Sequence, residues 1–464
     1  MKTQGLEMHL ASTILILTCL LLPFQTAIGQ WSPPKDLKKQ VDTLNEEQVE
    51  FLTSGAVLQF LPQQQLEHEL STRDTESLLG LLNDLMALSA EMSYDPERDM
   101  GATPLNIHSK RFNRGTLPTP PLLRKMERDP GPFSVHRYLF PQTGVPTFAG
   151  AKVAIWPEDL VAGKVDVAII GVPSNAGSGR RDANHGPNEM RATNTIVIPD
   201  VQSLIKPDEV LSLADYGDFS VDWLATELSI AHVTDMVAET AETGAIPMLV
   251  GGDTSMLYPG VKGVARARGS ATFGLLQLNA HPDAERFGDH TVSDRQSMFL
   301  LLDEGIVNGG DTIQVGLRGP EVDVETLQWL RDQKVRYHTM AEIQQRGFDN
   351  VLKRVISEVD KGPDAFFVSI DVSVISPTDM QAAGRMTPNG LRAEEVAQAI
   401  RHVCAAKEIV GFEITDLAPM LDLSRLSVLN ANSMLNACLI GIALRKNGLR
   451  PEYVHPLALD HGQR

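Results

Sequence analysis

Short apolar segments that alternate with longer amphipathic ones are the feature that most constrains the fold of this chain. From residue 165 onward we predict eight strands, at 166–172, 210–216, 247–250, 272–278, 312–317, 335–338, 365–370 and 409–415. We expect helices between them, for example at 225–242, 324–332, 341–358 and 393–406. Strands that are apolar along almost their whole length are typical of a parallel sheet covered on both faces. The pattern predicts an α/β domain and leaves a closed eight-unit barrel open as the alternative.

Two of the predicted strands end in side chains of the kinds that bind metals. They are Asn279, His281 and Asp283 after the fourth strand, and Asp371 and Ser373 after the seventh. Alternate residues of a strand share a face, so the first three could converge while the strand geometry persists. Open α/β sheets carry their sites at the carboxyl ends of the strands. We therefore expect these side chains to cluster at one end of the sheet.

These segments resemble the metal-binding signatures of the ureohydrolase family, which includes arginase and agmatinase. The family's Asp-Ala-His-x-Asp reads Asn-Ala-His-Pro-Asp at 279–283, its Ser-x-Asp-x-Asp reads Ser-Ile-Asp-Val-Ser at 369–373, and its Gly-Gly-Asp-His-Ser reads Gly-Gly-Asp-Thr-Ser at 251–255. Further elements follow in family order over about residues 135–450. The resemblance implies an open, doubly wound, mostly parallel sheet in an arginase-like three-layer αβα domain.

The resemblance also implies a site for two divalent ions, usually manganese, held by six side chains. At the six positions this chain has Thr254 in place of His, Asn279 in place of Asp, His281, Asp283, Asp371, and Ser373 in place of Asp. Close divalent cations need carboxylates to offset their repulsion, and an imidazole is a favoured ligand of transition metals. We expect a degenerate site rather than a full dinuclear manganese centre. One ion on the three retained ligands is the alternative.

Four other residues match positions with roles in the family. Asp253 matches a supporting position beside the metals. Asp416 stands where the family has a Glu that pairs with the substrate guanidinium, and Glu413 stands where it has an Asp, so a small guanidino compound remains a candidate ligand. His290 lies in the region of a proton-relaying His, but the spacing does not match, and a surface-loop histidine is the favoured interpretation.

In the family, metal-dependent hydrolysis of a guanidino C–N bond releases urea. Because three ligands are replaced in three separate signatures, we expect this copy to be catalytically degenerate or strongly altered. The alternatives are an active agmatinase-like amidinohydrolase with one metal or a rearranged site, and a structural or interaction subunit. The resemblance further implies a homo-oligomer, a trimer or a hexamer. The formal net charge of −18 argues against nucleic-acid partners.

Residues 1–29 resemble a secretory signal peptide. Lys2 lies in a short polar region, the apolar run 10–24 is short for a membrane span, and small residues occupy positions 27 and 29. An uncleaved anchor is the alternative. We expect a secreted or periplasmic protein without a membrane span after cleavage.

Residues 30–150 form an extension with helices expected at 44–61 and 75–92, followed by a proline-rich wrap. Residues 151–464 form the ureohydrolase-like domain. The apolar face of 75–92 is expected to pack on that domain, with a partner site as the alternative. Cys404 and Cys438 lie in apolar helical patterns, which favours buried free thiols over a disulfide.

Overall fold

The computed structural model of the chain describes residues 31–92, 129–135, 145–178, 182–193, 199–222, 226–269, 272–286, 292–460 and 462. The chain divides into two compact units, residues 1–112 with 117–127 and residues 113–116 with 128–464. The predicted signal peptide, His290 and most of the proline-rich segment lie outside the described residues.

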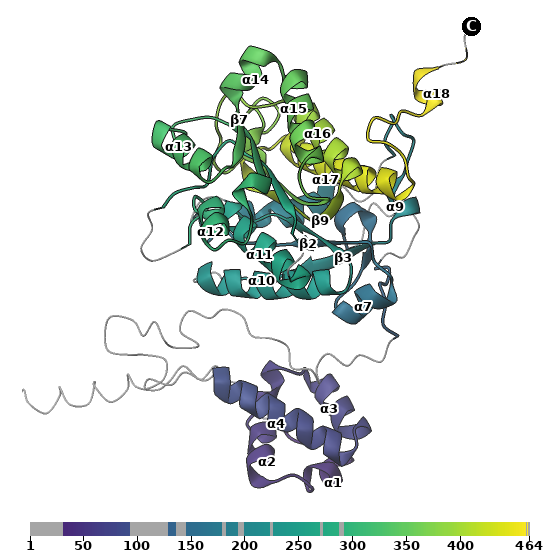
Figure 1. The fold of residues 1–464 in the computed structure, drawn as a ribbon. Helices are drawn as coiled ribbons and strands as arrows, with labels where there is room; N and C mark the ends of the chain where they lie inside the picture. Colours follow the sequence, from purple (N-terminus) through teal and green to yellow (C-terminus); the bar gives the residue numbers. More distant parts are fainter. Residues whose placement is uncertain are drawn as a thin grey trace, which may run out of the picture. The chain divides into compact units, whose positions relative to one another are not determined.

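The N-terminal unit is helical (Figure 1). Its elements are α1 (Lys38–Val41), α2 (Glu46–Thr53), the 3-10 helix η1 (Ala56–Gln59), α3 (Gln63–Thr72) and α4 (Thr75–Met92). Helix α4 has the predicted bounds. The predicted helix 44–61 is instead two elements, because Gly55 between them has a φ of 80°. Leucines on one face of α4 pack with those of the other N-terminal helices in a core of this unit. The expectation that this face packs on the α/β domain is wrong.

The second unit contains an open parallel sheet. Its strands are β1 (Lys152–Val153), β2 (Val167–Gly171), β3 (Leu213–Asp218), β4 (Ile246–Val250), β5 (Gly274–Leu278), β6 (Thr312–Leu317), β7 (Arg336–Thr339), β8 (Ala365–Asp371) and β9 (Glu408–Thr415). They run in the order β1-β3-β2-β4-β9-β8-β5-β6-β7, and every pairing is parallel. All eight predicted strands are confirmed, and the barrel alternative is wrong. Strand β1 was not predicted because two residues are too few to show a pattern.

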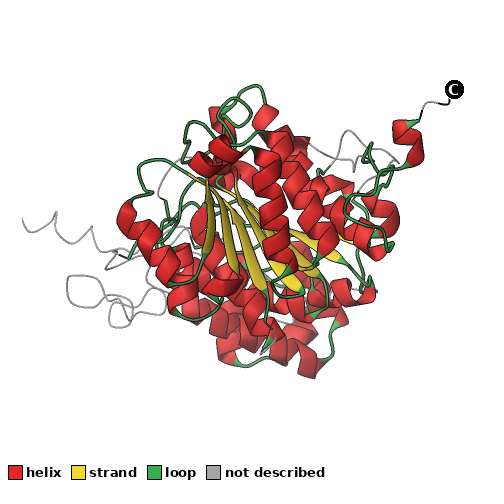
Figure 2. Ribbon diagram, turned by 45° about the horizontal axis from the view of Figure 1, so that its top comes forward, coloured by secondary structure: helices red, strands yellow, loops and turns green. Residues whose placement is uncertain are grey.

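Helices cover both faces of this sheet (Figure 2). Alternate residues of β2 enter two different cores: Val167 and Ile169 pack on one face, Ala168 and Ile170 on the other. The first core receives α8 (Gly186–Thr193), α14 (Met340–Arg346), α15 (Phe348–Asp360), α16 (Ala393–Ala406) and α17 (Leu426–Lys446). The second receives α7 (Pro157–Ala162), α10 (Thr226–Glu242), α11 (Leu257–Arg268) and α12 (Ser297–Asp303). The predicted three-layer αβα architecture is confirmed.

Shorter elements complete the domain: η2 (Phe148–Gly150), η3 (Ala183–His185), α9 (Pro207–Val210), η4 (Thr254–Met256), η5 (Gly309–Asp311), α13 (Val324–Asp332), η6 (Val372–Val374), η7 (Pro419–Leu421) and α18 (Pro456–Leu459). The predicted helix 341–358 is two helices, α14 and α15, which Gly347 separates with a φ of 81°. Helix α17 is long and apolar enough to cross a membrane, but 72% of its most apolar window is buried in the domain. Burial of most of this window indicates that α17 is a core helix of the domain.

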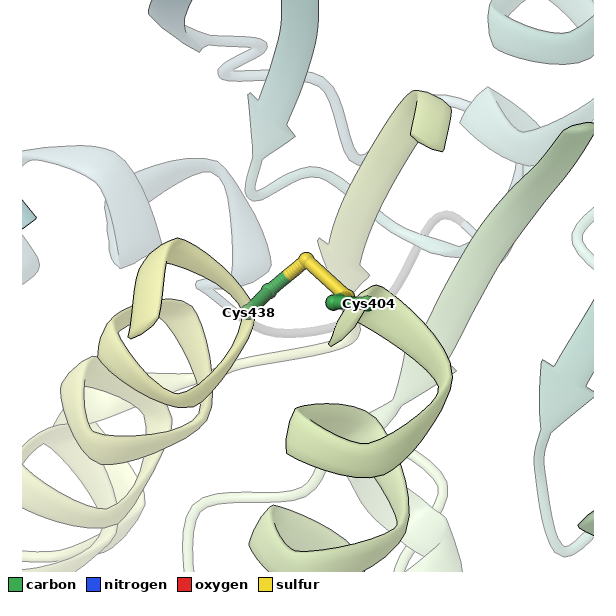
Figure 3. Close-up of a disulfide and its surroundings, with 2 residues drawn as sticks. All are labelled: Cys404 and Cys438. Carbon is green, nitrogen blue, oxygen red and sulfur yellow. A yellow bond between two sulfur atoms is a disulfide. The ribbon is translucent and has the colours of Figure 1, made fainter. Parts of the chain in front are cut away.

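A disulfide joins the two central helices of one layer. Cys404 of α16 and Cys438 of α17 are fully buried, and their Cα atoms lie 5.3 Å apart (Figure 3). Gly441 lets the helices approach, because a Cβ there would collide with Cys404. The expectation of free thiols is wrong. The apolar helical patterns correctly predicted that each cysteine lies on a buried helix face. They did not indicate that these two faces are in contact.

Candidate active site at the carboxyl edge of the sheet

Four neighbouring strands, β4, β9, β8 and β5, deliver the site residues at their carboxyl ends. Strand β5 stops at Leu278, so Asn279, His281 and Asp283 follow it on irregular backbone. Asp283 has a φ of 47°, which non-glycine residues rarely adopt. The three side chains do converge, but the strand periodicity used to predict their convergence does not extend to them.

The residues at the six predicted ligand positions are all buried and bonded to one another. Thr254 Oγ1 donates to Asp371 Oδ2 at 2.5 Å, and Asn279 Nδ2 donates to Asp283 Oδ2 at 2.5 Å. Ser373 Oγ lies 3.2 Å from Asn279 Oδ1, to which it donates. The three residues that replace family ligands, Thr254, Asn279 and Ser373, therefore all form hydrogen bonds within the cluster. Two of the three supply a hydrogen to a carboxylate that the family resemblance assigns to metal binding.

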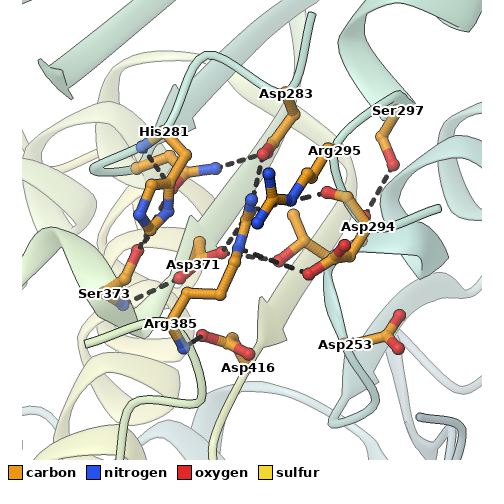
Figure 4. A network of polar contacts seen from close by, with 12 residues as sticks. Asp253, His281, Asp283, Asp294, Arg295, Ser297, Asp371, Ser373, Arg385 and Asp416 are labelled. Atoms are coloured by element: carbon orange, nitrogen blue, oxygen red, sulfur yellow. Dashed lines mark hydrogen bonds and ion pairs between the residues drawn. The ribbon is translucent and has the colours of Figure 1, made fainter. Parts of the chain in front are cut away.

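Arg385 lies at the centre of this cluster (Figure 4). Its side chain is 5% exposed, and its Nη2 lies 2.6 Å from Asp283 Oδ1 and 3.7 Å from Asp371 Oδ2. Its Nε lies 3.4 Å from Asp294 Oδ2, and its Nη1 lies 3.4 Å from Glu321 Oε2. Sequence reasoning missed this residue. The available signal was a basic side chain next to Gly384, in the loop that follows the second signature.

Burial dominates the titration of these groups. It raises the pKa of Asp283 to about 7 and that of Asp294 to about 6, although the Arg385 charge opposes both shifts. Burial, reinforced by the charge of Arg385, lowers the pKa of His281 to about 3 and keeps its imidazole neutral. Burial also disfavours the charge of Arg385, but Asp283, Asp371 and Asp294 outweigh it and raise the pKa of Arg385. The Arg385 guanidinium thus stays positively charged.

The predicted guanidinium-binding residues are engaged elsewhere. Glu413 accepts a hydrogen bond from Ser369 Oγ at 2.7 Å, and burial raises its pKa to about 8. Asp416, whose φ is 66°, accepts the backbone N–H of Arg385 at 2.6 Å, so it fixes the loop that carries the arginine. Asp253 accepts backbone N–H groups of Ser178 and Ser255 and thus joins two loops.

A second arginine, Arg191 of helix α8, is half-buried and contacts carboxylates of strand β3. Arg191 Nε and Nη2 contact the two carboxylate oxygens of Asp215 at 2.8 and 2.9 Å, and its Nη1 contacts Asp218 at 2.6 Å. The guanidinium lies 4.0 Å from the centre of the Phe148 ring. Asp215 also accepts the backbone N–H of Phe148. Arg191 thus ties helix α8 to strand β3 and to the segment at Phe148.

The carboxylates at the predicted ligand positions already have hydrogen-bond partners within the chain. Among the ligand carboxylates, Asp371 accepts hydrogen bonds on both oxygens, from Ser373 N and Thr254 Oγ1, and Asp283 accepts on both, from Arg385 and Asn279. A positive guanidinium between the two carboxylates would repel any added cation. The donor set and the resident charge both differ from what a dinuclear centre requires.

A surface cavity of about 210 Å³ leads to the cluster. Asp283 and Glu321, two of the carboxylates that contact Arg385, line it together with Arg286, Arg295 and Glu325. Arg286 pairs with Glu325, and Arg295 pairs with Glu321. Both arginines that line this cavity are thus already paired within the chain, and Glu285 and Asp323 also line it.

Comparisons with known proteins show the family of this chain. The sequence model of the Arginase family matches residues 165–441. Formimidoylglutamase of Bacillus subtilis is 25% identical over 307 residues, which are 63% of this chain and 91% of that protein. Guanidinopropionase of Pseudomonas aeruginosa is 26% identical over 297 residues, which are 63% of this chain and 90% of that protein.

Solved structures share the fold. Proclavaminate amidino hydrolase from Streptomyces clavuligerus gives a TM-score of 0.58 at 22% identity. The match covers 66% of this chain and 99% of that protein. Trypanosoma cruzi formiminoglutamase, a structure with Mn²⁺, gives 0.55 at 22% identity and covers 61% of this chain and 95% of its own. With the nine-stranded sheet and the family match over most of the α/β domain, the conclusion is that this chain belongs to the arginase family.

Proposed function

We propose that this arginase-family chain does not hydrolyse guanidino C–N bonds and that it acts as a non-catalytic protein built on the family fold. One observation carries the proposal: all four oxygens of Asp283 and Asp371 already accept hydrogen bonds from donors of the chain. Family chemistry needs those oxygens free to bind metal, because the metal makes water a nucleophile near neutral pH. Because these oxygens are already occupied by donors of the chain, the arrangement supports a pocket that does not carry out that chemistry.

Family membership, together with a relative solved with Mn²⁺, suggests a divalent metal at this position. In this chain, His281, Asp283 and Asp371 are the residues that would hold one ion. Such an ion would have to displace Asn279 and Thr254 from the carboxylates and approach Arg385. Each displacement leaves a buried polar group without its partner, which costs about 1–3 kcal/mol. This cost favours the non-catalytic role over a one-metal amidinohydrolase.

The test measures metal content and urea release together. Purified chain, incubated with Mn²⁺ and then desalted, is analysed for bound manganese and assayed with arginine, agmatine and 3-guanidinopropionate. We expect less than one manganese per chain and no urea above background, while an active arginase-family enzyme treated in the same way turns over. Two manganese ions per chain with sustained urea release would contradict the proposal.

A ligand restoration refines this test. Combining Thr254→His, Asn279→Asp and Ser373→Asp should raise the manganese content, since it restores an imidazole and two carboxylates. Each single restoration should raise it less, because ligands that act as a unit have non-additive effects. Equal manganese content in the wild type and the triple variant would show that the replaced ligands do not limit metal binding.

We also propose that the chain is exported after cleavage of residues 1–29 and forms a homo-oligomer. The buried bridge between Cys404 and Cys438 supports export, because disulfides persist in oxidising compartments. Mature protein recovered from its source should begin near Gln30, and light scattering should give a mass of three or six chains. Full-length chain that begins at Met1 in the cytosol would contradict export, and a monomeric mass would contradict assembly.

A further inference from the structure

We infer that Arg385 is the resident cation of this pocket: its guanidinium fills the space among four carboxylates and supplies the positive charge that the family signatures assign to metal ions. The inference rests on the proposed function, because it explains how a pocket without metal keeps its acidic residues buried. It also goes further, since it makes the pocket a guanidinium site that the chain occupies with its own side chain.

Arg385 is the ion-pair partner of the two central carboxylates, Asp283 and Asp371. Asp283, Asp294, Glu321 and Asp371 all lie at ion-pair distance from its guanidinium. In the part of the chain that the structure describes, no other Lys or Arg forms an ion pair with Asp283 or Asp371. The other buried arginine nearby, Arg318, donates to backbone carbonyls, among them those of Ser373 and Pro388. Arg385 is therefore the cation that pairs with Asp283 and Asp371, while Arg295 shares Glu321 with it.

The loop that carries Arg385 is fastened at its base. Asp416 accepts the backbone N–H of Arg385 at 2.6 Å, and its own carbonyl accepts the backbone N–H of Gly384 at 2.8 Å. Gly384 has no room for a side chain, because a Cβ there would collide with the Asp416 carboxylate. Two residues on, the Thr387 hydroxyl lies 3.0 Å from His281 Nε2, and its carbonyl accepts from Arg318 Nη2. Anchors on both sides direct the guanidinium into the cluster.

The contacts are those of a cation in a polyacidic cavity rather than of a paired salt bridge. A carboxylate matched to a guanidinium makes two parallel short hydrogen bonds. Arg385 makes one short contact, to Asp283, and three of 3.4–3.7 Å. Its Nε, although buried, forms no hydrogen bond with the described residues. The carboxylates thus surround a volume that another planar cation can refill when the side chain is removed.

The experiment removes the side chain and returns its head group as a free molecule. Arg385→Ala leaves a cavity lined by Asp283, Asp294 and Asp371, which the 210 Å³ surface cavity reaches through Asp283. Thermal unfolding is followed against guanidinium chloride from 0 to about 20 mM, with NaCl holding the ionic strength constant. Urea, which is planar but neutral, and tetramethylammonium, which is charged but bulky, serve as control ligands.

We expect guanidinium to raise the Tm of Arg385→Ala saturably, by about 2–4 °C at ten times its dissociation constant. Wild type, whose own arginine fills the site, should show no such rise. Arg266→Ala, which loses the exposed partner of Asp235, is the matched control and should not respond either. Equal responses of wild type and Arg385→Ala, or an equal rise with urea or tetramethylammonium, would overturn the inference.

A measurement on the unmodified chain covers the case in which Arg385→Ala does not fold. Native wild type is treated with phenylglyoxal, and modification of each arginine is read by peptide mass spectrometry. Arg385 should be modified at least tenfold more slowly than Arg266, which is 53% exposed, and added Mn²⁺ should not speed its modification. Rapid modification of Arg385, or acceleration by Mn²⁺, would show that the side chain leaves the cluster.

These outcomes separate the inference from the proposed function. Wild type without manganese and without urea release, but with a reactive Arg385, would leave the proposed function standing and overturn the inference. Adding Arg385→Ala to the triple ligand restoration should raise the manganese content above that of the triple variant alone. An unchanged content would show that the arginine does not compete with metal.

Discussion

Two arginines of the same domain, Arg191 and Arg385, differ in how carboxylates are arranged around the guanidinium group. Arg191 holds both oxygens of Asp215 in a bidentate pair, adds Asp218 and lies over the Phe148 ring. Arg385 is more deeply buried and has four carboxylates around it and a single short contact. Around Arg191, the carboxylate of Asp215 matches the two parallel N–H groups of the guanidinium. Around Arg385, the carboxylates lie on several sides of the guanidinium, as ligands lie around a metal ion.

The difference also appears in how charge is shared. Two carboxylates share Arg191, and one of them, Asp218, is half exposed. Four share Arg385, and burial raises the pKa of two of these, Asp283 to about 7 and Asp294 to about 6. Carboxylates with such pKa values can take up protons when their cation is removed. The two arginines should therefore contribute differently to stability, and their contributions should depend differently on pH.

The largest expected effect is the loss of Arg191. Arg191→Met should lower the free energy of unfolding by about 3–5 kcal/mol, because it leaves the buried Asp215 without its partner. Arg266→Met, which removes one side of an exposed pair, should cost less than about 1 kcal/mol. Urea denaturation of both variants gives the comparison. Similar small costs would show that the bidentate pair is not a major stabilising contact.

A smaller, pH-dependent effect is expected for Arg385→Met. At pH 8 the variant should lose about 2–3 kcal/mol, because buried carboxylates are left without a cation. At pH 5.5, below the pKa of both Asp283 and Asp294, protonation should reduce the loss by about half. Urea denaturation at the two pH values tests this. A loss that is the same at both, as expected for Arg191→Met, would remove the distinction between the two arginines.

Glu413 shows what a buried carboxyl does without any guanidinium. Burial raises its pKa to about 8, against an ordinary value of 4.5, so the folded chain holds a proton that the unfolded chain releases. Its contribution to stability is therefore fully present below pH 4.5 and is lost as the pH rises towards 8. Glu413→Gln should remove this dependence, by about 1 kcal/mol per pH unit inside the window. Parallel stability profiles of variant and wild type would contradict the assignment.

The sequence predicted what depends on local pattern. Apolar runs located eight strands, and the bounds of α4, α13 and α16 agree with the prediction; at α13 the Asp323 side chain caps the first turn. The glycines at 55 and 347, which interrupt two predicted helices, are a local signal that was not used. The residues at the six positions that the family signatures mark lie together in one cluster.

What the sequence could not show depends on contacts between distant segments. Nothing near Cys404 or Cys438 indicates that α16 and α17 face each other at those positions. Nothing near residue 385 indicates that its loop is held by Asp416 and turns its arginine inward. Neutral replacements at Thr254, Asn279 and Ser373 predicted a weaker metal site. The structure adds that the Arg385 guanidinium lies at ion-pair distance from both Asp283 and Asp371.

The most direct measurement of that claim is a crystal structure of the wild type grown with excess MnCl₂, with diffraction data collected at the manganese absorption edge. We expect no anomalous peak between Asp283 and Asp371, and continuous density for the Arg385 guanidinium within hydrogen-bonding distance of Asp283. Two anomalous peaks bridged by these carboxylates, with Arg385 turned out of the cluster, would contradict the account.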